Sequence, residues 1–199
     1  MDAVARAVSK GDLRATIVLA ASDRSKAPAV ERARRLGIPC ETFLPREGPE
    51  GAWERRLVAR LEELRTELVV LAGFLRVLGP PFFERFPGRI INLHPSLLPR
   101  HSGPGMYGTR VHAAVLASGD PRTGATVHVV TEEVDRGPVL AKTEIEVRPG
   151  ETATELADRQ RPLEHALLIE VLGRFCRREL PLPYPVPARA APTAGGLRG

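Results

Sequence analysis

Cysteine and long apolar runs are both scarce in this sequence of 199 residues. The two cysteines, Cys40 and Cys176, lie far apart and show no metal-ligand spacing, so we expect reduced thiols and no disulfide framework. No apolar run approaches the roughly 18 residues of a membrane span, and the first residues carry no secretory pattern. We therefore expect a cytoplasmic protein with no membrane partner.

Aromatic residues are also few, at 5% of the chain, although the formal net charge is +5. A positive charge favours polyanions, but nucleic-acid binding usually combines basic residues with aromatic side chains on one face. Many of the arginines instead stand among glutamates in helix-like segments such as 55–63. We expect a solvated surface of mixed charge and no nucleic-acid partner.

Short apolar, β-branched runs alternate with amphipathic segments along the chain. The runs predict strands at 14–20, 40–43, 68–72, 89–93, 123–130 and 139–147. The other segments predict helices at 1–10, 29–36, 53–64, 80–86, 109–117 and 152–178. This alternation is typical of an α/β fold, a doubly wound, mostly parallel and Rossmann-like sheet with helices on both faces.

The domain organisation is simple. Residues 1–180 are long enough for one domain with a single core, and Pro162 is expected to break its last helix. Residues 181–199 are rich in Pro, Ala and Gly, so we expect a disordered tail there.

The stretch Ile90–Gly108 carries the chemistry that stands out most. Asn92 and His94 are two residues apart at the end of a predicted strand, so both side chains fall on one face. Pro95 ends the strand because proline cannot donate to a sheet ladder. An amide and an imidazole at the carboxyl end of a strand suit a reaction that develops negative charge on oxygen.

Asp135, in a glycine-bounded acidic turn, is the candidate partner of His94. A carboxylate beside an imidazole favours its charged form, and a charged His94 together with Asn92 would stabilise the oxyanion of a tetrahedral intermediate. The sequence has no Gly-x-Ser-x-Gly elbow, and neither cysteine is near His94. Direct attack of one substrate on another is therefore favoured over an acyl-enzyme.

The spacing of the histidines gives no sign of a metal site. His94 and His101 lack the spacing of zinc ligands, so no metal is expected. His112, His128 and His165 are interpreted as structural or peripheral.

The octapeptide Asn-Leu-His-Pro-Ser-Leu-Leu-Pro, Asn92–Pro99, resembles the signature of the folate-dependent formyltransferases. The likeness continues through 71–78, 134–138 and 164–165, and it is strongest to the branch that acts in purine synthesis. It implies transfer of the formyl group of 10-formyltetrahydrofolate to the amine of glycinamide ribonucleotide, with no metal, and it leaves a homodimer open.

The resemblance also assigns residues to roles. Asn92, His94 and Asp135 would be the catalytic trio, and Glu164 with His94 would bind the ribonucleotide. Folate would be bound by Leu75, Arg76, Val77, Leu78, Asn92, Thr131, Glu132, Glu133 and Val134.

The family pattern departs from this sequence at the amino end. It implies a strand and a Gly-x-Gly-Ser-Asn type loop ahead of the segment that begins at Met1, and amides of such a loop would bind the ribonucleotide phosphate. Two alternatives therefore stay open. One is a formyltetrahydrofolate hydrolase, in which water replaces the amine, and the other is a non-catalytic folate-binding protein.

Overall fold

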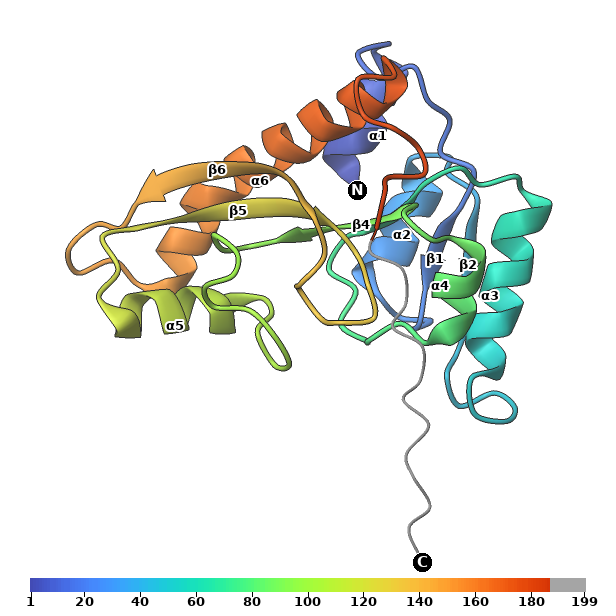
Figure 1. The fold of residues 1–199 in the computed structure, drawn as a ribbon, viewed down its shortest axis with the longest axis horizontal. Coiled ribbons are helices and arrows are strands. Elements are labelled where there is room, and N and C mark those ends of the chain that lie inside the picture. The colour runs from blue at the N-terminus through green and yellow to red at the C-terminus, as the bar shows by residue number, and fades with distance from the viewer. Residues whose placement is uncertain (187–199) are drawn as a thin grey trace, which may run out of the picture.

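The computed structural model describes residues 1–186, in which strands and helices alternate (Figure 1). The elements are α1 (Asp2–Ser9), β1 (Ala20–Ser22), α2 (Pro28–Arg35), β2 (Cys40–Thr42), α3 (Ala52–Glu63), β3 (Val69–Leu71), α4 (Pro80–Arg85), β4 (Ile90–His94), α5 (Thr109–Ser118), β5 (Arg122–Val129), β6 (Val139–Glu146) and α6 (Ala153–Cys176). The predicted α/β class is confirmed.

The strands form two sheets, one with the order β1-β2 and one with the order β3-β4-β5-β6. β1 pairs with β2 and β3 with β4 in parallel, whereas β4–β5 and β5–β6 are antiparallel. The antiparallel pairing places Asn92 opposite His128 and His94 opposite Thr126. The end of β4 therefore lies beside residues that come more than thirty positions later in the chain.

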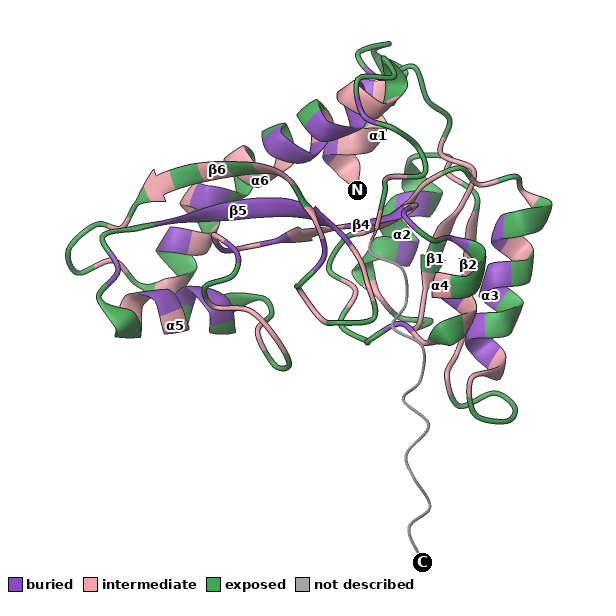
Figure 2. Ribbon diagram, in the orientation of Figure 1, coloured by how far each residue is buried: buried purple, intermediate pink, exposed green. Residues whose placement is uncertain are grey.

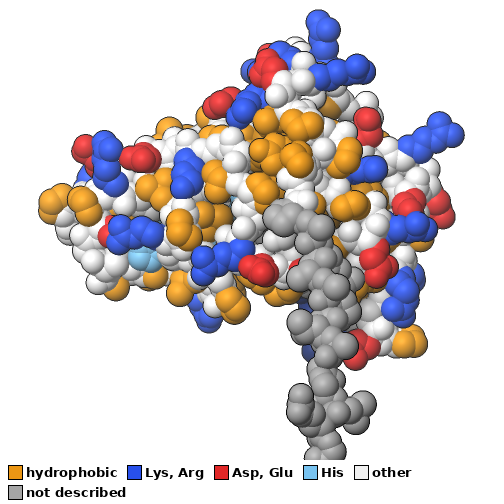
Figure 3. Space-filling model, in the orientation of Figure 1, with side chains coloured by type: hydrophobic (Ala, Val, Ile, Leu, Met, Phe, Trp, Pro, Cys, Tyr) orange, Lys and Arg blue, Asp and Glu red, His pale blue; other side chains and the backbone are white. Residues whose placement is uncertain are grey.

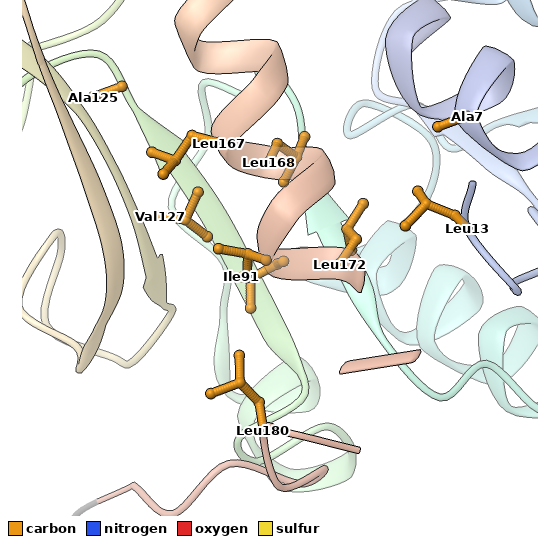
Figure 4. Close-up of a cluster of buried hydrophobic side chains, with 10 residues drawn as sticks. Ala7, Leu13, Ile91, Ala125, Val127, Leu167, Leu168, Leu172 and Leu180 are labelled. Atoms are coloured by element: carbon orange, nitrogen blue, oxygen red, sulfur yellow. The ribbon is translucent and has the colours of Figure 1, made fainter. Parts of the chain in front are cut away.

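Helices cover both faces of the larger sheet, as adjacent residues of β4 show. Successive side chains of a strand point to opposite faces. Ile91 packs in a cluster with Ala125 and Val127 of β5 and the leucines of α6. Figure 4 shows Leu167 beside Val127 and Leu172 on the side of the helix that faces Leu13. Ile90 packs instead with residues of α3 and α4 in a second cluster that includes Trp53 and Phe82.

β5 is the most buried strand, and every residue after Arg122 in it is buried (Figure 2). β6 alternates between exposed and half-buried positions, as expected for a strand at the sheet edge with one face toward α6. The side chains that β5 contributes to the site, Thr126 and His128, are therefore shielded from water.

Two predicted boundaries are wrong. The strand expected at 14–20 begins only at Ala20, because a β-branched run becomes a strand where a neighbouring main chain pairs with it, here Cys40. Pro162 does not break the last helix: α6 continues through it. Both halves of α6 carry buried leucines, such as Leu156 and Leu168, and this packing outweighs the cost of one proline.

The segment 181–186 packs against the body of the fold. The Tyr184 N–H donates to the Gly88 carbonyl at 2.8 Å, so the first residues of the predicted tail are ordered. Residues 187–199, the rest of that prediction, lie outside the described residues.

Acidic and basic side chains are interspersed over the face drawn in Figure 3, in keeping with the expected surface of mixed charge. Within residues 1–186, no helix is long and apolar enough to cross a membrane.

Candidate active site

The site is built on the carboxyl end of β4. Asn92 and His94 share one face of the strand, as predicted, and His94 is 3% exposed. β4 ends at His94, and Pro95 opens the loop that reaches α5.

His94 has a partner at each ring nitrogen. Its Nε2–H donates to the main-chain carbonyl of His101 at 2.9 Å. Because a carbonyl only accepts, Nε2 carries the proton. Nδ1 lies 3.6 Å from Oδ2 of Asp135, and both side chains are more than nine-tenths buried.

Asp135 is held in place by main chain from another loop. Its backbone is in the left-handed region, with a φ of 57°, and its Oδ2 accepts from the Gly103 N–H at 2.9 Å. The turn around it requires glycine at 137, since a Cβ there would lie 1.8 Å from the Val129 carbonyl oxygen. Loop 95–108 and the β5–β6 turn therefore meet at this carboxylate.

His128 joins Asn92 to Asp135. Its Nδ1–H donates to the Val129 carbonyl at 3.0 Å, so Nε2 can accept from the Asn92 amide at 3.2 Å. The same Nε2 lies 3.7 Å from Oδ1 of Asp135. Burial lowers the pKa of His128, which keeps the ring neutral.

The interpretation of His128 as structural or peripheral missed this position. The residue lies in a largely apolar strand and is 1% exposed, and a histidine in such a strand is ordinarily interpreted as part of the core. Only the antiparallel register, with His128 opposite Asn92, reveals it as part of the network.

The loop after His94 is fixed by buried hydroxyls. Thr126 Oγ1 donates to the Ser96 carbonyl at 2.7 Å, and Ser96 Oγ donates to the Arg100 carbonyl at 2.6 Å. Lys142 Nζ donates to the Leu98 carbonyl at 2.6 Å. Ser96 and Thr126 are fully buried, so water does not compete at their hydroxyls.

Glu164 is linked to the loop through α6. The amide of Gln160 donates to Glu164 at 2.8 Å and to the Pro95 carbonyl at 3.2 Å. Gln160 is fully buried, and its Oε1 has no hydrogen-bond partner among the described residues. The predicted ribonucleotide residue therefore lies one side chain away from the segment that carries His94.

Comparison with known proteins decides the family. The profile of the formyl transferase family matches residues 1–172. The chain belongs to the formyl transferase family.

Three relatives of this formyl transferase family member carry similar names. It is 38% identical over 174 residues to the chloroplastic phosphoribosylglycinamide formyltransferase of Arabidopsis thaliana, covering 86% of this chain but only 60% of that protein. It is 33% identical to phosphoribosylglycinamide formyltransferase of Escherichia coli, covering 88% and 81% of the two chains. The solved glycinamide ribonucleotide transformylase 1 of Symbiobacterium toebii superposes with a TM-score of 0.84 at 32% identity, covering 90% and 83%.

The predicted folate segment of this formyl transferase family member divides into exposed and buried positions. Leu75 and Val77 are 48% and 63% exposed, unusual for apolar side chains, while Leu78 is buried in the cluster of α3 and α4. Arg76 donates to Asp23 at 2.8 Å. The side chain of Leu78 is therefore not available to a ligand, whereas those of Leu75 and Val77 are.

The second predicted folate segment, 131–134, precedes Asp135 directly. Thr131 Oγ1 donates to the Glu133 carbonyl at 3.2 Å and stabilises the turn. Glu132 and Glu133 are exposed, and Val134 is half-buried. Phe74 and Val130, which precede the two folate segments, pack against the same apolar cluster.

Proposed function

We propose that the protein transfers the formyl group of 10-formyltetrahydrofolate to the amine of glycinamide ribonucleotide. The observation that carries the proposal is the buried network in which Asp135 faces both His94 and His128, and His128 accepts from Asn92. These residues come from two strands and a turn, so the fold brings them together. The names of the relatives support the same reaction.

The donors of this network match the charge that the reaction develops. The amine attacks the formyl carbon and forms a tetrahedral intermediate with a negative oxygen. The Asn92 amide has two N–H donors, of which His128 takes one, so the other can bind the oxyanion. A charged His94 adds a positive group beside Asp135, whose carboxylate stabilises that charge.

Collapse of the intermediate completes the transfer. The bond between the formyl carbon and N10 of the folate breaks, and the proton lost by the amine is relayed to N10. The products are tetrahydrofolate and the ribonucleotide formylated on its amine. The 3.6 Å separation of His94 and Asp135 leaves room for this contact to tighten when substrates bind. Most of the acceleration would come from juxtaposition of the two substrates and from donors already in place.

The other predicted contacts fit around this centre. Leu75 and Val77 offer exposed apolar surface to a flat pterin, and the 131–134 turn would cover its other side. Glu164 would bind the ribonucleotide from α6, next to the Pro95 carbonyl that Gln160 contacts.

The proposal is tested by incubating the purified chain with 10-formyltetrahydrofolate, with and without glycinamide ribonucleotide, and following both products by mass spectrometry. Formation of the formylated ribonucleotide at a rate that requires His94 supports it. Release of formate in the absence of the amine would favour the hydrolase. Folate binding with no turnover in either mixture would favour a non-catalytic protein.

A further inference from the structure

A second histidine–carboxylate pair joins the loop that follows β4 to the segment between α5 and β5. His101 Nε2–H donates to Asp120 Oδ2 at 2.7 Å, and Arg100 donates to the other oxygen of the same carboxylate. Asp120 is 8% exposed, and the side chain of His101 is also mostly buried. The pair lines an open cavity of about 250 Å³ together with Arg122 and Glu144.

The main chain of His101 is the feature that connects this pair to the site. His101 has a φ of 51°, a left-handed conformation that side chains with a Cβ rarely adopt. In this conformation its carbonyl accepts the Nε2–H of His94 at 2.9 Å. Asp120 is itself fixed between α5 and β5, directly after Gly119.

We propose that Asp120 and His101 are positioning residues for the formyl transfer. Asp120 holds the His101 side chain, the held side chain keeps the His101 carbonyl in place, and that carbonyl fixes both the orientation of the His94 ring and the position of its proton. Nδ1 of His94 is thereby directed at Asp135. Neither Asp120 nor His101 touches a substrate through its side chain.

Three observations support a specific positioning contact between Asp120 and His101 rather than general packing. The His101–Asp120 bond is short, at 2.7 Å, and it lowers the pKa of Asp120, so the carboxylate stays charged. The left-handed residue is the one whose carbonyl meets His94, so loss of the side-chain bond would let the backbone relax at that point. Thr126 and Lys142 tie the loop at residues 96–98, and the Ser96 hydroxyl donates to the His101 carbonyl at 3.4 Å, a longer contact than the 2.7 Å bond between the His101 side chain and Asp120.

The inference rests on the proposed function for its kinetic readout, so the experiment has two arms. His101→Leu and Asp120→Ala remove the bond, whereas His101→Gln keeps an N–H donor that can reach Asp120. Arg122→Gln is the matched control, because Arg122 lines the same cavity and pairs with Glu144 at 3.0 Å on the sheet. If Asp120→Ala is unfolded by circular dichroism, His101→Leu decides both arms, because Asp120→Asn would keep an oxygen that can accept from His101.

In the kinetic arm, His101→Leu and Asp120→Ala should each lower kcat by about tenfold to 100-fold, with KM for both substrates little changed. The double variant should be no worse than the poorer single one, since both act through one contact. His101→Gln should recover most of kcat, and Arg122→Gln should match the wild type. A folded Asp120→Ala variant with normal kcat overturns the inference.

The spectroscopic arm needs no turnover. Nitrogen NMR of the histidine rings at alkaline pH should show His94 protonated on Nε2 in the wild type, and a shift of the proton toward Nδ1, which faces Asp135, in Asp120→Ala and His101→Leu. An unchanged His94 tautomer in these folded variants overturns the positioning role even if kcat falls. If the wild type transfers no formyl group, the proposed function fails and this arm alone decides the inference.

Discussion

At the scale of single residues, burial favours the neutral form of two histidines, His112 and His128. His112 and His128 are 4% and 1% exposed, and burial lowers the pKa of both rings. His128 gains a main-chain partner and the Asn92 amide, whereas Nδ1 of His112 has no hydrogen-bond partner among the described residues. His112 should therefore be costly to protonate in the folded state.

This cost predicts a pH dependence of stability. Below about pH 6.5 the unfolded chain binds a proton at His112, whereas the folded chain resists protonation. The stability that the neutral His112 ring contributes is therefore fully present above that pH and is lost as the pH falls. His112→Phe keeps a ring and removes the titration. The urea midpoint of the wild type should fall more steeply than that of the variant between about pH 7 and about pH 5. Parallel midpoint curves would contradict the assignment.

A second residue-scale prediction concerns the exposed apolar side chains of the folate segment. Val77→Asp introduces a charge where a pterin would rest, so folate binding should weaken clearly while thermal stability stays close to wild type, because Val77 is exposed. Leu36→Asp, at another exposed apolar residue, is the control. Calorimetric titration with tetrahydrofolate gives both affinities, and equal affinities in the two variants would reject the placement.

The trio could be proposed from sequence because its members stand in short motifs. Asn92 and His94 share a strand face, and Asp135 stands in a glycine-bounded turn. His128, Gln160 and Asp120 could not, since each reaches the site through sheet register or helix packing that no local pattern encodes.

At the scale of elements, α6 shows where local rules are overridden. Pro162 removes one main-chain donor, but both ends of the helix are secured, one by a capping box and the other by leucines packed on the sheet. The helix boundaries at 109–118 and 80–85 fall close to their predictions because Gly108, Gly119 and Pro80 mark them. The start of β1 could not be predicted this way, since strand pairing depends on distant main chain.

The capping box of α6 gives an element-scale prediction. Thr152 accepts from the Glu155 N–H at 3.3 Å, and Glu155 accepts from the Thr152 N–H at 2.8 Å. Thr152→Ala should lower the free energy of unfolding by about 1 kcal/mol, whereas Thr152→Ser keeps the hydroxyl and should change it little. Urea unfolding of the three proteins measures this, and equal stability of all three would show that the cap contributes nothing.

At the scale of the whole molecule, the site lies where β4, β5 and two loops meet between two apolar clusters. The clusters pack against β4 from both faces. The face drawn in Figure 3 carries charges of both signs. The net charge of +5 leaves the expectation of no nucleic-acid partner to be tested by experiment.

Nucleic-acid binding provides the whole-molecule test of that surface. Duplex DNA and tRNA should bind weakly and lose most of that binding with a modest increase in salt, because only scattered phosphate contacts can form. Filter binding over a salt series measures this. Tight binding to tRNA that resists salt would instead indicate a nucleic-acid function.

The most direct measurement on the site is a double-variant cycle of steady-state formyl transfer with both substrates saturating. His94→Ala removes the imidazole, and Asp135→Asn removes the carboxylate that lies 3.6 Å from its Nδ1. Since the two act as one unit, the double variant should be little worse than the poorer single one, and Asn92→Ala should cost on the order of 10²–10³ in rate. Near-normal turnover of a folded His94→Ala variant would contradict the account and make the stretch after β4 a structural turn.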